Sequence, residues 1–220
     1  MRLFIGLQST YQFIECVLWH EEDFYLQPLP KEQASAQLIP TLNNLLAQHQ
    51  RQLSDVSCII ANQGPGPFTS LRTIIATVNG INFASNIPLI GINGLSAFLE
   101  EYKDPIGSPT VVLLNAFHHA IYFGIQENNK KPEIGYENID IFLAMLDERF
   151  SQQTIRFLGN GTKMYQDKIM SCFQDNAYIP EPLPLHCSLK HIMQLGIKEW
   201  QQQRNITKQI EPLYLKHPVN

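Results

Sequence analysis

The 220-residue sequence lacks long apolar runs, paired cysteines and clusters of basic residues. Residues 56–99 are mostly uncharged, but Asn, Gln, Gly and Pro interrupt them, so no 18-residue apolar segment could span a membrane. The amino terminus has no apolar core or small-residue cleavage site of the kind that signal peptides carry. The chain has 16 basic and 20 acidic residues and no run of Lys or Arg, so strong direct binding of nucleic acid is not favoured. These absences predict a cytoplasmic protein without a membrane segment.

The residue patterns of common catalytic and metal sites are also missing. The four cysteines lie far apart without a C-x-x-C pair, which argues against a zinc ribbon or redox dithiol and predicts buried, reduced thiols: Cys16, Cys58, Cys172 and Cys187. There is no H-E-x-x-H, H-x-x-x-H or G-x-S-x-G pattern. His118 and His119 are adjacent and would point to opposite sides of a strand. We therefore predict no catalytic, cofactor-binding or metal-binding residue in this chain.

Apolar periodicity predicts an α/β protein with mixed sheets and flanking helices in two lobes. The expected strands are residues 3–7, 13–19, 23–28, 58–61, 89–92, 110–114, 120–126 and 154–158. The expected helices are residues 33–50, 69–86, 96–101 (or from 93), 139–150, 162–172 and 188–203. A Pro/Gly-rich link at 102–109 places the domains at 1–105 and 106–220. Both halves begin with strands and end in strand-helix alternation, so the architecture could be duplicated without a sequence repeat.

The predicted helix at 69–86 carries only one charged residue, Arg72. Successive residues of a helix are rotated by about 100°, and this places the bulky aliphatic residues of the segment on one side. This side is expected to fill the core. We call the other side, made of small residues and threonines with Arg72 at its start, the slim side, and predict that it binds another polypeptide: Thr69, Arg72, Thr73, Ala76, Thr77, Gly80 and Ala84. The alternative is that a helix of the same chain, such as the one predicted at residues 33–50, covers the slim side. Arg72 would pair with a partner carboxylate or hold loop carbonyls, or would simply reach water at the helix edge.

A Gly/Pro loop precedes this helix and contains Gly64, Pro65, Gly66 and Phe68. The loop lacks the lysine of a P-loop, and it matches only G-x-G-x-x-T of the dinucleotide fingerprint because Thr69 replaces the third glycine. A helix start can attract an anion, but two prolines beside two glycines more often form a rigid turn. We therefore expect these residues to have a structural role.

The run "GPGPFTSLRTIIATVNGINFASNIPLIGINGLSAF", residues 64–98, resembles the G-P-G-S-F-T-G-L-R-x-G signature of the TsaB (YeaZ) family and the G-V-S-S-L-x-A that follows it. "NAFHHAIY", the "GNG" turn and "PLYLK" stand where that family has D-A-R-x-x-E-V-Y, a similar turn and P-x-Y-L-R. The resemblance covers nearly the whole chain.

This resemblance implies two actin-like or ribonuclease-H-like (ASKHA) lobes and a place in the bacterial machinery that adds threonylcarbamoyl to the anticodon-adjacent adenosine of tRNA. It implies a non-catalytic scaffold or activator that pairs with a catalytic paralogue, TsaD, which holds the metal, and with an ATPase, TsaE. ATP and metal are then expected on these partners, the isolated chain is expected to form a homodimer, and tRNA is expected to be contacted only through the complex. The alternatives are an independent actin-like nucleotide-hydrolysing enzyme and a self-associating structural protein.

The sequence departs from the family pattern at several positions. Residues 6–9 align with the I-D-T-S motif of actin-like nucleotide sites. In this alignment, Leu7 stands where the motif has its acidic residue. Pro67 and Ser70 stand where serine and glycine are usual. In the second lobe, the usual Asp, Arg and Glu are replaced by Asn115, Phe117 and Ala120. These departures argue against a nucleotide site in this chain.

Overall fold

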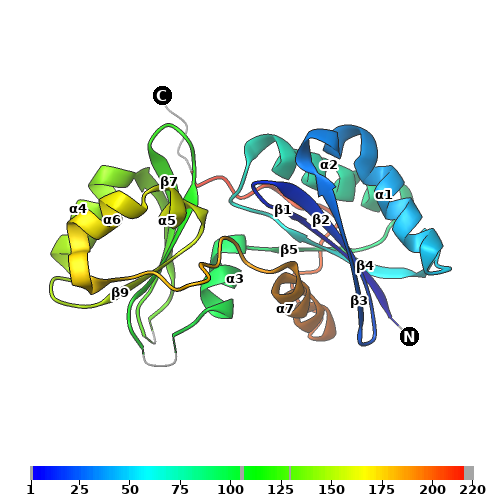
Figure 1. Cartoon of the computed structure of the whole chain (residues 1–220). Coiled ribbons are helices and arrows are strands. Elements are labelled where there is room, and N and C mark those ends of the chain that lie inside the picture. Colours follow the sequence, from blue (N-terminus) through cyan, green and yellow to red (C-terminus); the bar gives the residue numbers. More distant parts are fainter. Residues whose placement is uncertain (1, 105–106, 129, 216–220) are drawn as a thin grey trace. The chain divides into compact units, whose positions relative to one another are not determined.

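The computed structural model describes residues 2–104, 107–128 and 130–215, which fold into two compact units (Figure 1). Of the described residues, the first unit contains those up to Gly94 and Ser188–Leu213, and the second contains those from Leu95 to Cys187 together with Tyr214 and Leu215. The predicted boundary between residues 105 and 106 lies outside the described residues. The predicted ranges differ from the observed units at 95–104, which belong to the second unit, and at 188–213, which belong to the first because the helix that follows Ser188 packs on the first sheet. Within the described ranges, no helix is both long and apolar enough to cross a membrane.

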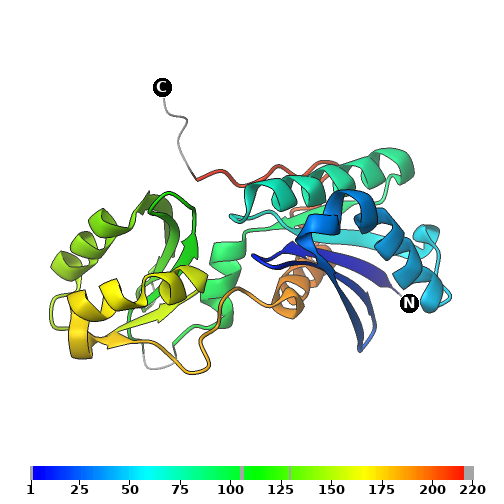
Figure 2. The same ribbon diagram turned by 45° about the horizontal axis from the view of Figure 1, so that its top comes forward.

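The first unit is a five-stranded mixed sheet with helices on both faces. Its strands lie in the order β3-β2-β1-β4-β5, with bounds β1 Leu3–Ser9, β2 Phe13–His20, β3 Asp23–Pro30, β4 Val56–Asn62 and β5 Leu89–Ile92. Its helices are α1 Ala34–Gln48, α2 Phe68–Ser85 and α7 Leu189–Gln201, with single 3₁₀ turns at Lys31–Gln33 and Leu53–Asp55. α1 and α2 lie on one face of the sheet and α7 lies on the other, as both views show (Figures 1 and 2).

Strand alternation decides which side chains meet which helices. Leu3, Ile5 and Leu7 of β1 point into the same hydrophobic core as the buried side chains of α1 and α2. Gly6 faces α7, where an added Cβ would lie 2.2 Å from the Met193 sulfur. At Gly196 of α7 an added Cβ would lie 2.4 Å from Ile60. Glycine at both positions therefore allows α7 to approach the sheet closely.

The second unit repeats the architecture of the first, as the sequence suggested. Its order β8-β7-β6-β9-β10 matches β3-β2-β1-β4-β5, including the antiparallel hairpins and the parallel inner strands. The strands are β6 Thr110–Asn115, β7 Ala120–Gln126, β8 Glu133–Asn138, β9 Ile155–Leu158 and β10 Ala177–Tyr178. The helices are α3 Gly94–Glu101, α4 Ile139–Arg149, α5 Asn160–Met164 and α6 Gln166–Phe173, with a 3₁₀ turn at Gln174–Asn176. The expected helix at 162–172 is therefore two helices, and β8 and β10 were not predicted.

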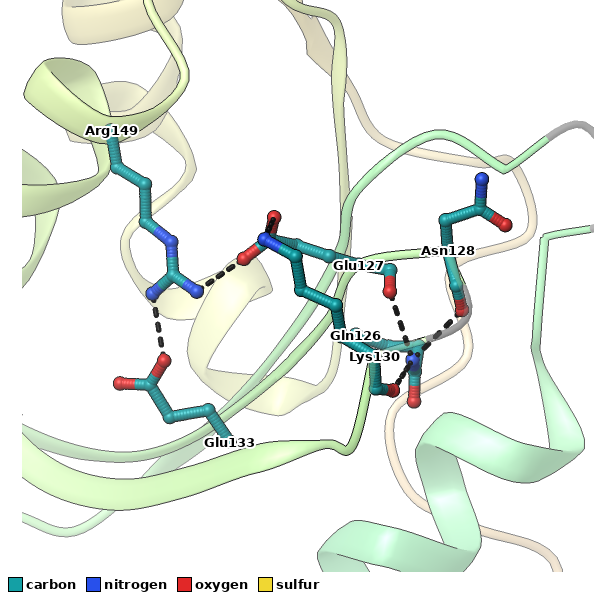
Figure 3. Close-up of polar contacts among 6 residues, drawn as sticks. All are labelled: Gln126, Glu127, Asn128, Lys130, Glu133 and Arg149. Atoms are coloured by element: carbon teal, nitrogen blue, oxygen red, sulfur yellow. Dashed lines mark hydrogen bonds and ion pairs between the residues drawn. The ribbon is translucent and has the colours of Figure 1, made fainter.

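An ion-pair network ties the β7–β8 hairpin of the second unit to the end of α4 (Figure 3). Arg149 pairs with Glu127 and, at 2.7 Å, with Glu133. Lys130 pairs with Glu127 at 2.8 Å, and the Gln126 amide donates to the carbonyl oxygens of Glu127, Asn128 and Lys130. The hydrogen bond from Lys130, opposed by partial burial and reinforced by Arg149, lowers the pKa of the Glu127 carboxyl below its usual 4.5.

We expect Glu127→Gln to destabilise the fold at neutral pH. The folded-state pKa of Glu127 is depressed, so ionised Glu127 stabilises the protein above its unfolded pKa, and this stabilisation is lost as pH falls through the folded pKa. The free energy of unfolding should fall by about 1 kcal/mol at pH 7, and the difference from wild type should vanish in acid. Urea unfolding at both pH values measures this. Glu148→Gln, an exposed position of α4, is the control, and an equal loss at pH 7 in that variant would contradict the prediction.

Candidate partner interface on helices α1 and α2

The orientation of α2 is set by its aliphatic side. Leu71, Ile74, Ile75 and Val78 are all buried in the core of the first unit. Burying side chains of this size stabilises a fold by roughly 1.5–3 kcal/mol each, so these four residues hold the helix in one rotation. The opposite side of α2 must then face away from the sheet.

The slim side of α2 is uncovered in this chain. Five of its seven predicted residues are exposed and two, Thr73 and Thr77, are half-buried: the exposed ones are Thr69, Arg72, Ala76, Gly80 and Ala84. An added Cβ at Gly80 would meet no other atom within 4 Å. The alternative in which the helix predicted at 33–50 covers this side is therefore wrong. That helix, α1, instead turns its own leucines into the shared core.

Two features of this surface were not predicted. Phe83 is 91% exposed on α2, and Phe68 at the start of the helix is 57% exposed. α1 contains no charged residue, and Ile39 on its outer side is 54% exposed. The lack of charge in residues 34–48 is visible in the sequence and could have indicated that α1 belongs to the same surface. We call the exposed residues of α1 and α2 together the α1/α2 face.

The Gly/Pro loop that leads into α2 is held by backbone hydrogen bonds. Gly64 has φ of +99°, a region that glycine adopts without strain, and its N–H donates to Asn62 Oδ1 at 2.9 Å. The Gly94 N–H donates to the Gly64 carbonyl oxygen at 2.8 Å, and the Leu213 N–H donates to the Gln63 carbonyl oxygen at 2.7 Å. The geometry agrees with a rigid turn that fixes where α2 begins.

Side chains at the start of α2 are engaged within the first unit. The Ser70 hydroxyl lies 2.6 Å from that of Ser9, so Ser70 joins the start of α2 to the end of β1. The Arg72 guanidinium lies 3.6 Å from the centroid of the Phe68 ring, a cation-π arrangement. Arg72 therefore stands over an exposed aromatic ring at the end of the α1/α2 face. Its pairing with a partner carboxylate stays a prediction.

The strand alternation of β1 places Leu7 and Gln8 on opposite sides of the first sheet, and the alignment of Leu7 with the acid of a nucleotide site stays a prediction. Leu7 is fully buried in the core beneath α1 and α2. Gln8 points to the other side, where its carbonyl oxygen accepts from Asn62 Nδ2 at 2.9 Å and its amide nitrogen donates to Glu15 at 3.1 Å. The residue of β1 that faces the Asn62 end of the loop is therefore a neutral amide.

In the second unit, the turn between β6 and β7 is exposed. Phe117, His118 and His119 all have positive φ, and the Asn115 side chain accepts from the Phe117 N–H at 2.8 Å. Both histidines lie at the surface, on this turn and not on a strand. Across the part of the chain that the structure describes, no group of three His, Cys, Asp or Glu residues could hold a metal ion.

The cysteines follow the prediction except for one. Cys16, Cys58 and Cys187 are buried, and burial raises the pKa of the Cys16 and Cys58 thiols to about 12. Cys172 is exposed, so the expectation that it is buried is wrong. It lies on the outer side of α6, whose inner side buries Ile169 and Phe173.

Comparison with known proteins places this architecture in a family. Residues 29–218 match the model of TsaD, tRNA N6-adenosine threonylcarbamoyltransferase. The chain is 23% identical over 223 residues to the tRNA threonylcarbamoyladenosine biosynthesis protein TsaB of Haemophilus influenzae, covering 96% of this chain and 92% of that protein. The protein of the same name from Buchnera aphidicola is 18% identical, covering 76% of this chain and 75% of its own.

Solved structures show the same fold. YeaZ from Pseudomonas aeruginosa superposes with a TM-score of 0.71 at 20% identity, covering 98% of this chain and 100% of that one. A Bacteroides thetaiotaomicron protein with an actin-like ATPase fold has a TM-score of 0.50 at 10% identity, covering 83% and 92%. The predicted actin-like α/β class is therefore confirmed. Since the family model spans most of the sequence, the chain belongs to the tRNA N6-adenosine threonylcarbamoyltransferase family, and its resemblance to the TsaB (YeaZ) proteins is confirmed.

Proposed function

We propose that this chain is a non-catalytic subunit in the threonylcarbamoylation of tRNA, and that its α1/α2 face pairs with a TsaD-like paralogue. The observation that carries the proposal is the uncovered, nearly charge-free outer surface of α2, on which Phe83 is 91% exposed. The names of the relatives supply the pathway, since TsaB is described as a tRNA threonylcarbamoyladenosine biosynthesis protein.

A protein partner explains this surface better than water does. A helix that faces solvent usually carries Lys or Glu on its outer side, whereas α1 has no charged residue and α2 has one. Small residues at 76, 80 and 84 lie at i, i+4 and i+8 and let a second helix approach closely. Gly80 costs about 1 kcal/mol in a helix interior relative to Ala, and close packing in a complex would offset this cost. Exposed Phe68 and Phe83 supply aromatic anchors of the kind that dominate binding energy at interfaces.

In this proposal the chemistry belongs to the partners. The TsaD-like paralogue would hold the metal and transfer the group, and a TsaE-like ATPase would join the pair and use ATP. The neutral Gln8 beside Asn62, where a carboxylate would be needed to organise a nucleotide-bound metal, supports a chain that binds no cofactor of its own. The isolated chain would form a homodimer through the α1/α2 face until the paralogue replaces the second copy.

The experiment that tests this function is mass spectrometry of tRNA nucleosides after depletion of the protein. We expect threonylcarbamoyladenosine to fall strongly, and the purified chain alone to show no ATP turnover. Unchanged modification would instead indicate a self-associating protein outside the pathway. Turnover of ATP by the isolated chain would indicate a nucleotide-hydrolysing enzyme and overturn the non-catalytic assignment.

A further inference from the structure

α7 presents a regular row of cationic and amide side chains on its outer side. Lys190, Gln194 and Lys198 are exposed and follow one another at i, i+4 and i+8. At 1.5 Å per residue, neighbouring members of the row lie about 6 Å apart along the helix axis. Gln201 and Gln202 continue the exposed surface at the end of the helix.

The orientation of this row is fixed by packing on the sheet. Leu189, Ile192 and Met193 are buried, and Gly196 lies directly against Ile60 of β4. A rotation of α7 would expose these apolar side chains, so the lysines are held on the side away from the sheet. The following segment is tied to β5 by two backbone hydrogen bonds between Thr207 and Leu89, both of 2.9 Å, and the exposed Lys208 comes directly after Thr207.

The charge of this region differs in sign from that of the whole chain. Residues 189–209 contain four basic residues and one acidic residue, a net charge of +3 in a chain of −4. The acidic residue, Glu199, accepts from Asn205 at 2.8 Å and lies 3.9 Å from Arg204. Within the described part of the chain, Lys190, Lys198 and Lys208 form no salt bridge. Their charges are therefore available to an anionic partner.

The row on α7 and the α1/α2 face are separate surfaces of the first unit. α1 and α2 lie on one side of the first sheet and α7 lies on the other, so within the first unit the α7 row and the α1/α2 face do not overlap (Figure 2). The exposed part of the α7 row has lysines and amides in place of aromatic anchors. Lysines bind phosphates, and amides can bond to sugar hydroxyls and base edges. This chemistry fits the backbone of an RNA better than it fits a protein.

We propose that the outer side of α7, with Lys190, Gln194 and Lys198, together with Lys208, forms a contact for the sugar-phosphate backbone of RNA. The identification of this RNA as tRNA rests on the proposed function. The contact has no sequence specificity and adds affinity to a complex whose other subunits perform the chemistry.

The test is the affinity for an unmodified tRNA transcript, measured by fluorescence anisotropy between 50 and 200 mM salt. The full chain is measured alone and in complex with the TsaD-like paralogue. We expect the double variant Lys190→Gln with Lys198→Gln to bind the transcript about tenfold more weakly at low salt. The slope of log affinity against log salt concentration should also become smaller by about 1.4–1.8, because each lost phosphate contact lowers this slope by about 0.7–0.9. Lys131→Gln with Lys163→Gln removes the same charge from exposed positions of the second unit and is the control.

The outcomes separate this inference from the proposed function. If the α7 variant pairs normally with the paralogue but binds tRNA as tightly as the control variant does, with the same salt slope, the RNA contact is overturned and the partner interface is unaffected. If wild type does not pair with the paralogue, the proposed function fails, and the measurements on the isolated chain still decide the RNA contact. Circular dichroism of both double variants verifies that they are folded.

Discussion

We expect Gly80→Arg to abolish the proposed pairing of this chain with a TsaD-like partner and with a second copy of itself, while the monomer stays folded. The position is exposed and an added side chain has free space, so the isolated fold accommodates arginine. Arginine is also a better helix former than glycine by roughly 0.5–1 kcal/mol, which favours the folded monomer. In a close helix–helix contact the same side chain would separate the two surfaces and bury a charge. We expect the affinity to fall about a hundredfold or more in analytical ultracentrifugation.

Ala76→Arg is a second variant of the same surface, one turn earlier on α2, and it should have the same effect. Ala144→Arg is the matched control, because Ala144 is an exposed alanine inside α4 of the second unit. Loss of pairing in all three variants would indicate a general effect of added charge. Loss of the helical circular dichroism signal in Gly80→Arg would indicate that the slim side is needed for folding. Normal pairing of a folded Gly80→Arg variant would exclude α2 from the interface.

Gly159→Ala is expected to cause the largest loss of stability among glycine substitutions with positive φ. Gly159 has φ of +97°, and an added Cβ would lie 2.1 Å from the carbonyl oxygen of Leu113, a backbone atom of the central strand β6. The strand cannot move aside without disturbing its pairing with β7 and β9. Backbone strain and steric overlap together should lower the free energy of unfolding by roughly 3–5 kcal/mol.

Gly107→Ala is the control for backbone strain alone. Its φ is +89°, but the nearest atoms to an added Cβ belong to the Asn128 side chain at 3.5 Å or more. This variant should lose only about 1–2 kcal/mol in urea unfolding. Equal losses in the two variants would mean that the overlap with Leu113 relaxes at no cost, and the steric explanation would be wrong.

Local signals in the sequence located most elements of the first unit. The predicted strand at 89–92 has the observed bounds of β5, and the predicted helix at 69–86 differs from α2 by one residue at each end. Glycine, proline and the lack of charge marked the loop and the α2 surface, because these residue types act within a few positions of the chain. β8, with half-buried residues such as Gly135 and Tyr136, has no comparable alternation and was missed.

Other features depend on contacts between distant segments. The sequence alone could not show whether α1 covers the slim side of α2, since both helices have an apolar side that can be buried in several ways. It also could not show that Leu7 belongs to the core while Gln8 bonds Asn62. Successive residues of a strand point to opposite sides of the sheet, and only the packing of distant helices on the sheet shows what each side faces.

The sequence by itself determined the α/β class, the rigid Gly/Pro loop, the aliphatic and slim sides of α2, and the family resemblance. Only the tertiary structure decided that α1 shares the exposed surface, that residues 188–213 complete the first unit, and that the lysines of α7 lie on the opposite side of the sheet. The physical reason is that side-chain periodicity specifies which side of an element is apolar, whereas the packing of elements far apart in the chain specifies what covers the other side.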